Sequence, residues 1–171
     1  MKEFIINDDN LRDEDIEMKV IRVKALMFNS NGNILLAFNN NTYQFPGGHV
    51  NDDEDIDECI KREIREEVGI DVEIKEEPFL SIETYDNNYF NTGKKVLNTI
   101  YYYRVFTDLE PDFSRTKYDQ LEMKTDFDLF YVSFSNLEKF LISKIDSNEI
   151  DPKIAREMLH VVREYNQIYG R

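Results

Sequence analysis

Cysteine is almost absent from this sequence of 171 residues, which has Cys59 alone, and tryptophan is missing altogether. A single cysteine excludes an intrachain disulfide, and we interpret Cys59 as a packing residue rather than a nucleophile. The sequence also lacks an apolar run long enough to span a membrane and the basic, then apolar, start of a signal peptide. We therefore expect a reducing, cytoplasmic setting and no membrane partner.

Positive charge is scarce, because 21 lysines and arginines stand against 35 aspartates and glutamates and give a formal net charge of −14. A negative field disfavours nonspecific binding to nucleic acid, so no long nucleic acid is expected as a partner. A small anionic substrate is compatible with this charge where arginines or a bound metal ion supply positive charge locally. For most of the acidic residues, the simplest interpretation is solubility.

The length and the 41% of hydrophobic residues predict a single domain over residues 1–171. We expect a core at about residues 19–145 and a C-terminal helical extension at about 146–171. Residues 1–17 are interpreted as either a frayed lead-in or an edge strand. The last helix is amphipathic and packs either on its own domain or on a partner, so a homodimer is one of the expected outcomes.

The order of predicted elements is strands, helix, strands, helix, helix. This order favours an α+β fold with a mixed sheet and helices on its faces over a doubly wound parallel sheet. A long loop is predicted at residues 107–125, and Ser135 and Asp151 are predicted to cap the last two helices. Strands are predicted at residues 19–28, 34–38, 43–45, 70–74, 79–85, 96–106 and 127–134, and helices at residues 55–68, 137–145 and from 152 onwards.

The stretch from Gly48 to Ile70 is unusually acidic, with nine acidic residues before its second glycine, Gly69. Its helical part has two adjoining stripes. The apolar stripe consists of Ile56, Ile60, Ile64 and Val68, and the acidic stripe of Glu63, Glu66 and Glu67. Three carboxylates within about one turn repel each other, and a hard divalent cation such as Mg²⁺ removes that repulsion. The alternative is a solvated acidic helix face.

The spacing within this stretch resembles the signature of the Nudix hydrolase family at every fixed position. Counted from Gly48, it reads Gly, five residues, Glu54, seven residues, Arg62-Glu63-Ile64, one residue, Glu66-Glu67, one residue, Gly69-Ile70. The resemblance covers about residues 19–137. It implies a Nudix-type α/β/α sandwich with a mixed central sheet and an extra C-terminal helix, and a MutT-like pyrophosphohydrolase activity.

The resemblance also implies roles for single residues. Glu66 and Glu67 would bind Mg²⁺ or Mn²⁺ together with the carbonyl of Gly47, and Glu63 would be a further ligand or the general base. Arg62 would orient Glu63, and Glu54 would reach the metal through water. From helical spacing alone, Arg62 can pair with Glu58 or Glu66.

The implied substrate is a small nucleotide, a nucleoside diphosphate linked to another moiety, and its identity stays open. Many family members take one more acid from the loop before the last strand, for which Glu122, Asp126 and Asp128 are the candidates here. Tyr85 is a weaker candidate for substrate binding, since tyrosines on a strand are often core residues. The alternative function is a Nudix-fold nucleotide-binding or regulatory module with little hydrolysis.

Overall fold

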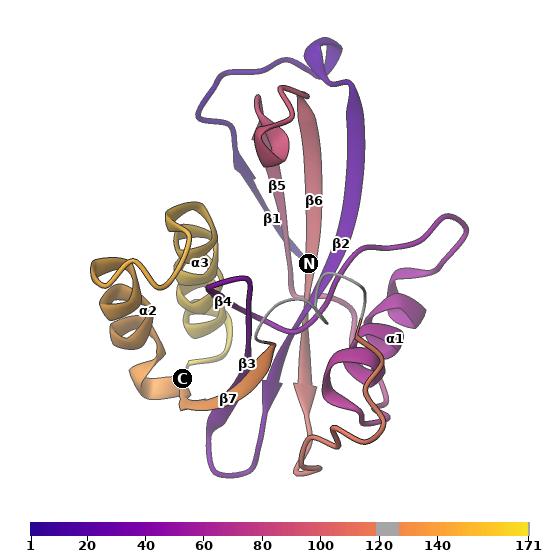
Figure 1. The fold of residues 1–171 in the computed structure, drawn as a ribbon, viewed down its shortest axis with the longest axis vertical. Helices are drawn as coiled ribbons and strands as arrows, with labels where there is room; N and C mark the ends of the chain where they lie inside the picture. Colours follow the sequence, from indigo (N-terminus) through magenta and orange to yellow (C-terminus); the bar gives the residue numbers. More distant parts are fainter. Residues whose placement is uncertain (119–126, 171) are drawn as a thin grey trace.

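The computed structural model describes residues 1–118 and 127–170. In these residues a mixed sheet has the strand order β1-β5-β6-β2-β3-β4, and β7 also pairs with β3 (Figure 1). β1 runs parallel to β5 and β2 runs parallel to β6, whereas the other pairs are antiparallel. The strands are β1 (Lys2–Ile6), β2 (Met18–Phe28), β3 (Asn33–Asn39), β4 (Thr42–Gln44), β5 (Leu80–Asp86), β6 (Val96–Phe106) and β7 (Asp128–Ser133).

The helices lie on both faces of the sheet, which confirms the predicted α+β class. Helix α1 (Ile56–Val68) covers one face, and helices α2 (Leu137–Asp146) and α3 (Pro152–Tyr169) cover the other (Figure 1). Short 3-10 helices connect these elements and are η1 (Asp13–Asp15), η2 (Tyr89–Asn91) and η4 (Phe134–Asn136).

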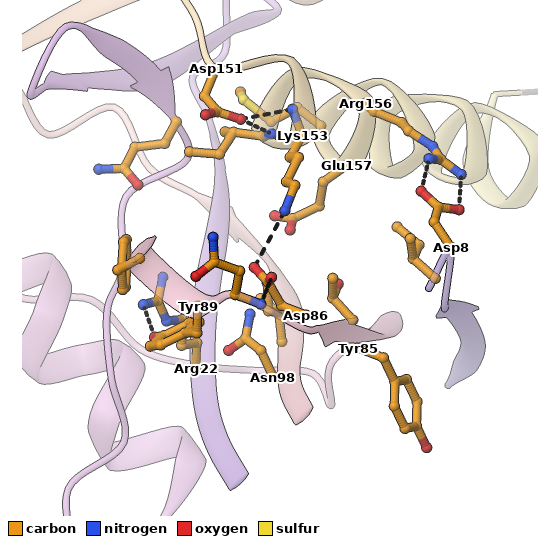
Figure 2. A pocket seen from close by; sticks show the side chains of 18 of the residues that line it. Asp8, Arg22, Tyr85, Asp86, Tyr89, Asn98, Asp151, Lys153, Arg156 and Glu157 are labelled. Carbon is orange, nitrogen blue, oxygen red and sulfur yellow. Dashed lines mark hydrogen bonds and ion pairs between the residues drawn. The ribbon is translucent and has the colours of Figure 1, made fainter. Parts of the chain in front are cut away.

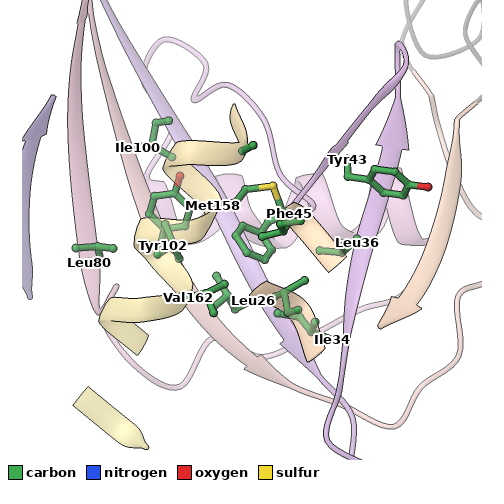
Figure 3. Close-up of a cluster of buried hydrophobic side chains, with 14 of the residues drawn as sticks. Leu26, Ile34, Leu36, Tyr43, Phe45, Leu80, Ile100, Tyr102, Met158 and Val162 are labelled. Atoms are coloured by element: carbon green, nitrogen blue, oxygen red, sulfur yellow. The ribbon is translucent and has the colours of Figure 1, made fainter. Parts of the chain in front are cut away.

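Strand β2 contributes to the core on both faces, because successive side chains of a strand point in opposite directions. Leu26 and Phe28 belong to the cluster beneath α2 and α3, whereas Val23, Ala25 and Met27 belong to the cluster beneath α1. Figure 3 shows strand side chains of the first cluster meeting those of α3; its labelled members are Leu26, Ile34, Leu36, Tyr43, Phe45, Leu80, Ile100, Tyr102, Met158 and Val162.

The N-terminal segment forms an edge strand, which decides between the two interpretations of residues 1–17. β1 pairs with β5, and the ring of Phe4 stacks on His160 of α3 at 3.7 Å between centroids. Lys2 forms an ion pair with Glu164 of the same helix. The apolar side of α3 packs into the protein's own core, and in the described residues no helix is both long and apolar enough to cross a membrane.

Two local predictions were wrong. Residues 70–74 do not form a strand, although Ile70, Val72 and Ile74 pack their alternating side chains into the cluster beneath α1. The predicted cap Ser135 does not begin α2, because the chain is already helical there in η4, and Asn136 is the residue that precedes α2. Asp151 does cap α3, since its side chain accepts hydrogen bonds from the N–H groups of Lys153 and Ile154.

Candidate active site

The loop that carries the two central glycines runs alongside β2 and is bound to it through the backbone. The Ala25 N–H donates to Pro46 O at 2.8 Å, and the Val23 N–H donates to Gly48 O at 3.0 Å. Gly47 has a φ of +133°, and a Cβ there would lie 2.2 Å from Val23 O. Only glycine therefore fits between the loop and the strand at position 47.

Helix α1 is fixed at both ends. Asp55 caps its N-terminus by accepting from the Asp57 N–H at 2.8 Å. At the other end Gly69 has a left-handed backbone conformation, with a φ of 77°, as glycines that end helices often have. The segment at residues 107–118 crosses this end, and the Asp112 N–H donates to Val68 O at 2.9 Å. A loop was predicted at residues 107–125, and residues 107–118 form one, whereas residues 119–125 lie outside the described residues. The described part satisfies carbonyls that α1 leaves free.

The backbone of Gly47 is held at both its N–H and its carbonyl by charged side chains. Its N–H donates to Glu67 of α1 at 2.8 Å, and Glu67 is only 3% exposed. Its carbonyl accepts from the Lys24 Nζ at 3.0 Å, and the same ammonium donates to Gln44 at 3.0 Å. Burial lowers the pKa of Lys24. The two contacts of Gly47 therefore join the loop, helix α1 and strand β2 at this one residue.

Arg62 connects three glutamates of the acidic stretch. Its guanidinium donates to both carboxylate oxygens of Glu54, at 2.7 and 2.8 Å. Its Nη1 donates to Glu63 at 2.7 Å and to Glu66 at 3.0 Å. The bonds from Arg62 lower the pKa of Glu54 to about 2. Arg62 therefore acts as a fork that sets the relative positions of these carboxylates.

Helical spacing predicted Glu58 or Glu66 as a partner of Arg62. The bond to Glu66 confirms one of the two, and the prediction of Glu58 was wrong. Glu58 pairs instead with Lys61, at 2.8 Å, on the exposed side of the helix. Arg62 reaches Glu54, which lies eight residues earlier in the loop. A partner outside the helix cannot be read from i±4 spacing, which describes neighbours on one helix only.

Glu63 lies between Arg62 and the glycine loop. A Cβ on Gly48 would be 2.5 Å from the Glu63 Oε2, so the carboxyl group packs directly on the backbone of that residue. Burial raises the pKa of Glu63, and this effect exceeds the opposing effect of Arg62.

The donor atoms at this site suit a hard divalent cation. Glu63, Glu66 and Glu67 offer carboxylate oxygens and Gly47 offers a carbonyl oxygen, which are the ligand types that Mg²⁺ prefers. In the part of the chain that the structure describes, no three acidic, histidine or cysteine side chains lie close enough together to hold a metal ion. Arg62 binds two of the carboxylates and the Gly47 N–H binds the third, so each donor is engaged by the protein itself.

A cleft of about 440 Å³ opens on the face of the sheet that α3 covers (Figure 2). Lys24 and Gln44 line it, and Lys24 also donates to Gly47 O, so the cleft adjoins the acidic site. Sequence reasoning missed Lys24, although a signal exists. It lies on the same face of β2 as Leu26 and Phe28, which are core positions, and a lysine aimed at a core needs a polar partner.

The predicted substrate-binding residues are dispersed. Tyr85 lies at the cleft, but its ring points away (Figure 2) and its hydroxyl donates to Asp13 at 2.7 Å. Asp128 is exposed at the start of β7, where it accepts from the Leu129 N–H, and it does not line the cleft. Glu122 and Asp126 lie outside the described residues.

Comparison with known proteins agrees with this architecture. A family model described as NUDIX domain matches residues 18–151. The MutT protein from Methanosarcina mazei Go1 is similar at 22% identity and a TM-score of 0.56, over 86% of this chain and 95% of that chain. A NUDIX hydrolase from Nitrosomonas europaea is similar at 16% identity and a TM-score of 0.58, over 86% of this chain and 88% of that chain. At these identities the two structures establish a shared fold.

Proposed function

Since the chain belongs to the Nudix family, we propose that it hydrolyses the pyrophosphate bond of a nucleoside diphosphate linked to another moiety. The products are a nucleotide and the phosphorylated second moiety, or a nucleotide and pyrophosphate where the substrate is a nucleoside triphosphate. The reaction depends on Mg²⁺ or Mn²⁺. One observation carries the proposal, which is that Glu63 and Glu67 of α1 both contact the Gly47–Gly48 loop.

Glu66, Glu67 and the Gly47 carbonyl are the groups that would hold the ion, with Glu63 beside them. A divalent cation bound there supplies positive charge to phosphate oxygens and lowers the pKa of a bound water molecule. Arg62 fixes the position of Glu63 through its bond of 2.7 Å. Glu63 accepts the proton of the attacking water at its carboxylate.

Lys24 has a positioning role. Its ammonium holds the Gly47 carbonyl and lies where it can compensate the charge of the buried Glu67.

We extend the proposal to the domain boundaries, since β1 and α3 pack on the sheet outside residues 18–151. The whole chain is then a single catalytic domain.

The test replaces Glu67 by glutamine and compares it with a matched control on the same helix. Glu67→Gln keeps an oxygen that can accept from the Gly47 N–H but removes the negative charge, so we expect hydrolysis to fall at least about 100-fold with the fold retained. Glu58→Gln changes an exposed carboxylate that pairs with Lys61, and we expect it to keep the parent rate. The assay is a panel of nucleotides with Mg²⁺ or Mn²⁺, with phosphate measured with and without an added phosphatase.

Two outcomes would contradict the proposal. If Glu67→Gln hydrolysed as fast as the parent protein, the assignment of Glu67 to the metal would be wrong. If the parent hydrolysed nothing across the panel but bound one nucleotide tightly, the binding-module alternative would be favoured.

A further inference from the structure

Strand β1 leaves one edge of the sheet open. Among the strands that the structure describes it pairs with β5 alone, and it stands at the border of the sheet (Figure 1). Natural edge strands are often protected by a proline or a β-bulge. The five residues of β1 contain no proline, and they pair with β5 in unbroken register. Phe4 and Ile5 are 38% and 59% exposed, so apolar side chains lie at this open edge.

The backbone groups that β1 offers outward belong to Glu3 and Ile5. The Lys2 N–H donates to Phe79 O, just before β5, at 3.0 Å. In a parallel ladder the residues that bond to the neighbouring strand alternate, so Lys2 and every second residue after it are bonded to β5. The N–H and C=O groups of Glu3 and Ile5 therefore point away from the sheet. Two outward residues spaced in this way are what an antiparallel partner strand requires.

A second copy of β1 fits this edge in one symmetric register. With a two-fold axis at Phe4, Glu3 of each copy lies opposite Ile5 of the other, and the two pairs form four hydrogen bonds. An axis at Glu3 would place two carboxylates directly opposite each other, which destabilises a strand pair. An axis at Ile5 would require the Asn7 carbonyl, which already accepts from the Asn10 N–H at 3.3 Å.

Side chains and charges also match in this register. The two Phe4 rings meet beside the axis, on the face where each ring stacks on His160 of its own copy, and aromatic pairs across strands are favourable. The N-terminal end of β1 carries Lys2, whereas Asp8 and Asp9 follow its C-terminal end. Antiparallel pairing brings these opposite charges together, and parallel pairing would join like charges.

We propose that two copies of this chain pair through β1 and form a dimer with one continuous sheet. Each copy has one β1, so the two-fold contact closes and leaves no β1 edge for a third copy. Two strands of five residues bury less than the roughly 1,200 Å² of a standard interface, so we expect a weak dimer with a Kd of about 10–100 µM. Each copy has a formal net charge of −14, so added salt should tighten the dimer by screening repulsion. The proposal does not depend on the proposed function.

Sedimentation of the full chain from about 1 to 500 µM measures this association. We expect the mass to rise from that of a monomer to that of a dimer over this range. A chain that stays monomeric would leave the edge to an extended segment of another protein and overturn the proposal. Growth beyond a dimer would also overturn it, because the β1 contact closes.

Ile5→Pro tests the backbone pairing. Proline removes the outward N–H of residue 5 and leaves the bonds between β1 and β5 in place, since proline is tolerated where an edge N–H faces solvent. The dimer loses two hydrogen bonds, one from each copy, so we expect the Kd to rise at least about tenfold while the Tm is retained. Ile5→Thr keeps the N–H and a β-branched side chain, and it should dimerise like the parent. Equal Kd values for these two variants would overturn the proposal.

Cysteine cross-linking tests the register independently. Phe4→Cys places two thiols at the axis, where the Cα atoms of a non-hydrogen-bonded pair lie about 4.5 Å apart, within disulfide range. Lys2→Cys is the control, because its two thiols would be four positions out of register, more than about 13 Å apart. Cys59 is fully buried and does not compete. We expect oxidation at about 100 µM to yield a covalent dimer of Phe4→Cys alone. Equal cross-linking of both variants, or of neither, would refute the pairing.

Discussion

Gly48→Ala is the sharpest test of how the acidic site is positioned. Gly48 has no left-handed φ, so alanine is compatible with its backbone, but the added methyl group would lie 2.5–2.6 Å from three atoms of the Glu63 carboxyl group. Ordinary contact begins at 3.4 Å, so this group must move by about 0.9 Å. The clash falls on the end of a side chain rather than on backbone, and the fold can absorb it.

A misplacement of about 1 Å at a reacting group costs roughly 100-fold in rate, which is about 2.7 kcal/mol of activation free energy. We therefore expect the kcat for metal-dependent hydrolysis to fall about 100-fold, while the Tm stays within about 3 °C of the parent value. Steady-state kinetics and thermal unfolding measure the two quantities.

The same change in a Glu63→Gln background separates this mechanism from a general disturbance of the loop. Because Gly48→Ala acts through Glu63, the double variant should be little slower than Glu63→Gln alone. Fully multiplicative effects, or a Gly48→Ala enzyme with the parent kcat, would refute the reasoning.

Three further predictions follow from the described contacts. Gly69→Ala should destabilise the protein by about 1–3 kcal/mol more than Gly32→Ala in urea unfolding, because both positions have positive φ but only at Gly69 would a Cβ meet backbone, at 1.9 Å from Asp112 O; equal losses would show that the crossing segment gives way. Mg²⁺ at about 100 times its Kd should stabilise the protein by about 2.7 kcal/mol, seen as a rise in Tm that Glu67→Gln abolishes and that EDTA reverses together with hydrolysis; an unchanged shift in the variant would contradict the ligand assignment. Burial lowers the pKa of His160 below its ordinary value of 6.5, so the folded state binds this proton less readily than the unfolded state and stability should fall as the pH drops below 6.5; urea midpoints at pH 7 and 5 should differ less in His160→Leu than in the parent, and an identical difference would exclude this source.

Helix α1 could be predicted closely because its signals are local. The predicted helix at residues 55–68 differs from α1 by one residue, because Asp55 caps the helix instead of belonging to it, and Gly69 ends it. Its apolar stripe was correct for Ile60, Ile64 and Val68, which are fully buried. Caps, terminal glycines and periodicity act within a few residues, so one sequence suffices to find them.

Contacts between distant segments could not be predicted from a single sequence. The parallel pairing of β1 with β5 joins residues about eighty positions apart, and no local pattern specifies it. Residues 70–74 have the alternation of a strand, yet alternation reports burial of side chains and not the presence of a partner strand. The cleft beneath α3 likewise depends on side chains that the fold brings together from β2, β5, β6 and α3, such as Lys24, Asn98 and Glu157.

The contacts between β1 and α3 have a consequence for the order of folding. Lys2 pairs with Glu164, and Phe4 stacks on His160, so these contacts close a loop of more than 150 residues. During synthesis β1 can join β5 soon after residue 86 has emerged, but it gains its covering helix only when residue 160 has been made. Contacts of such long sequence separation form slowly. During synthesis, β1 is therefore the strand that stays uncovered for the longest time and is exposed meanwhile to pairing with other chains.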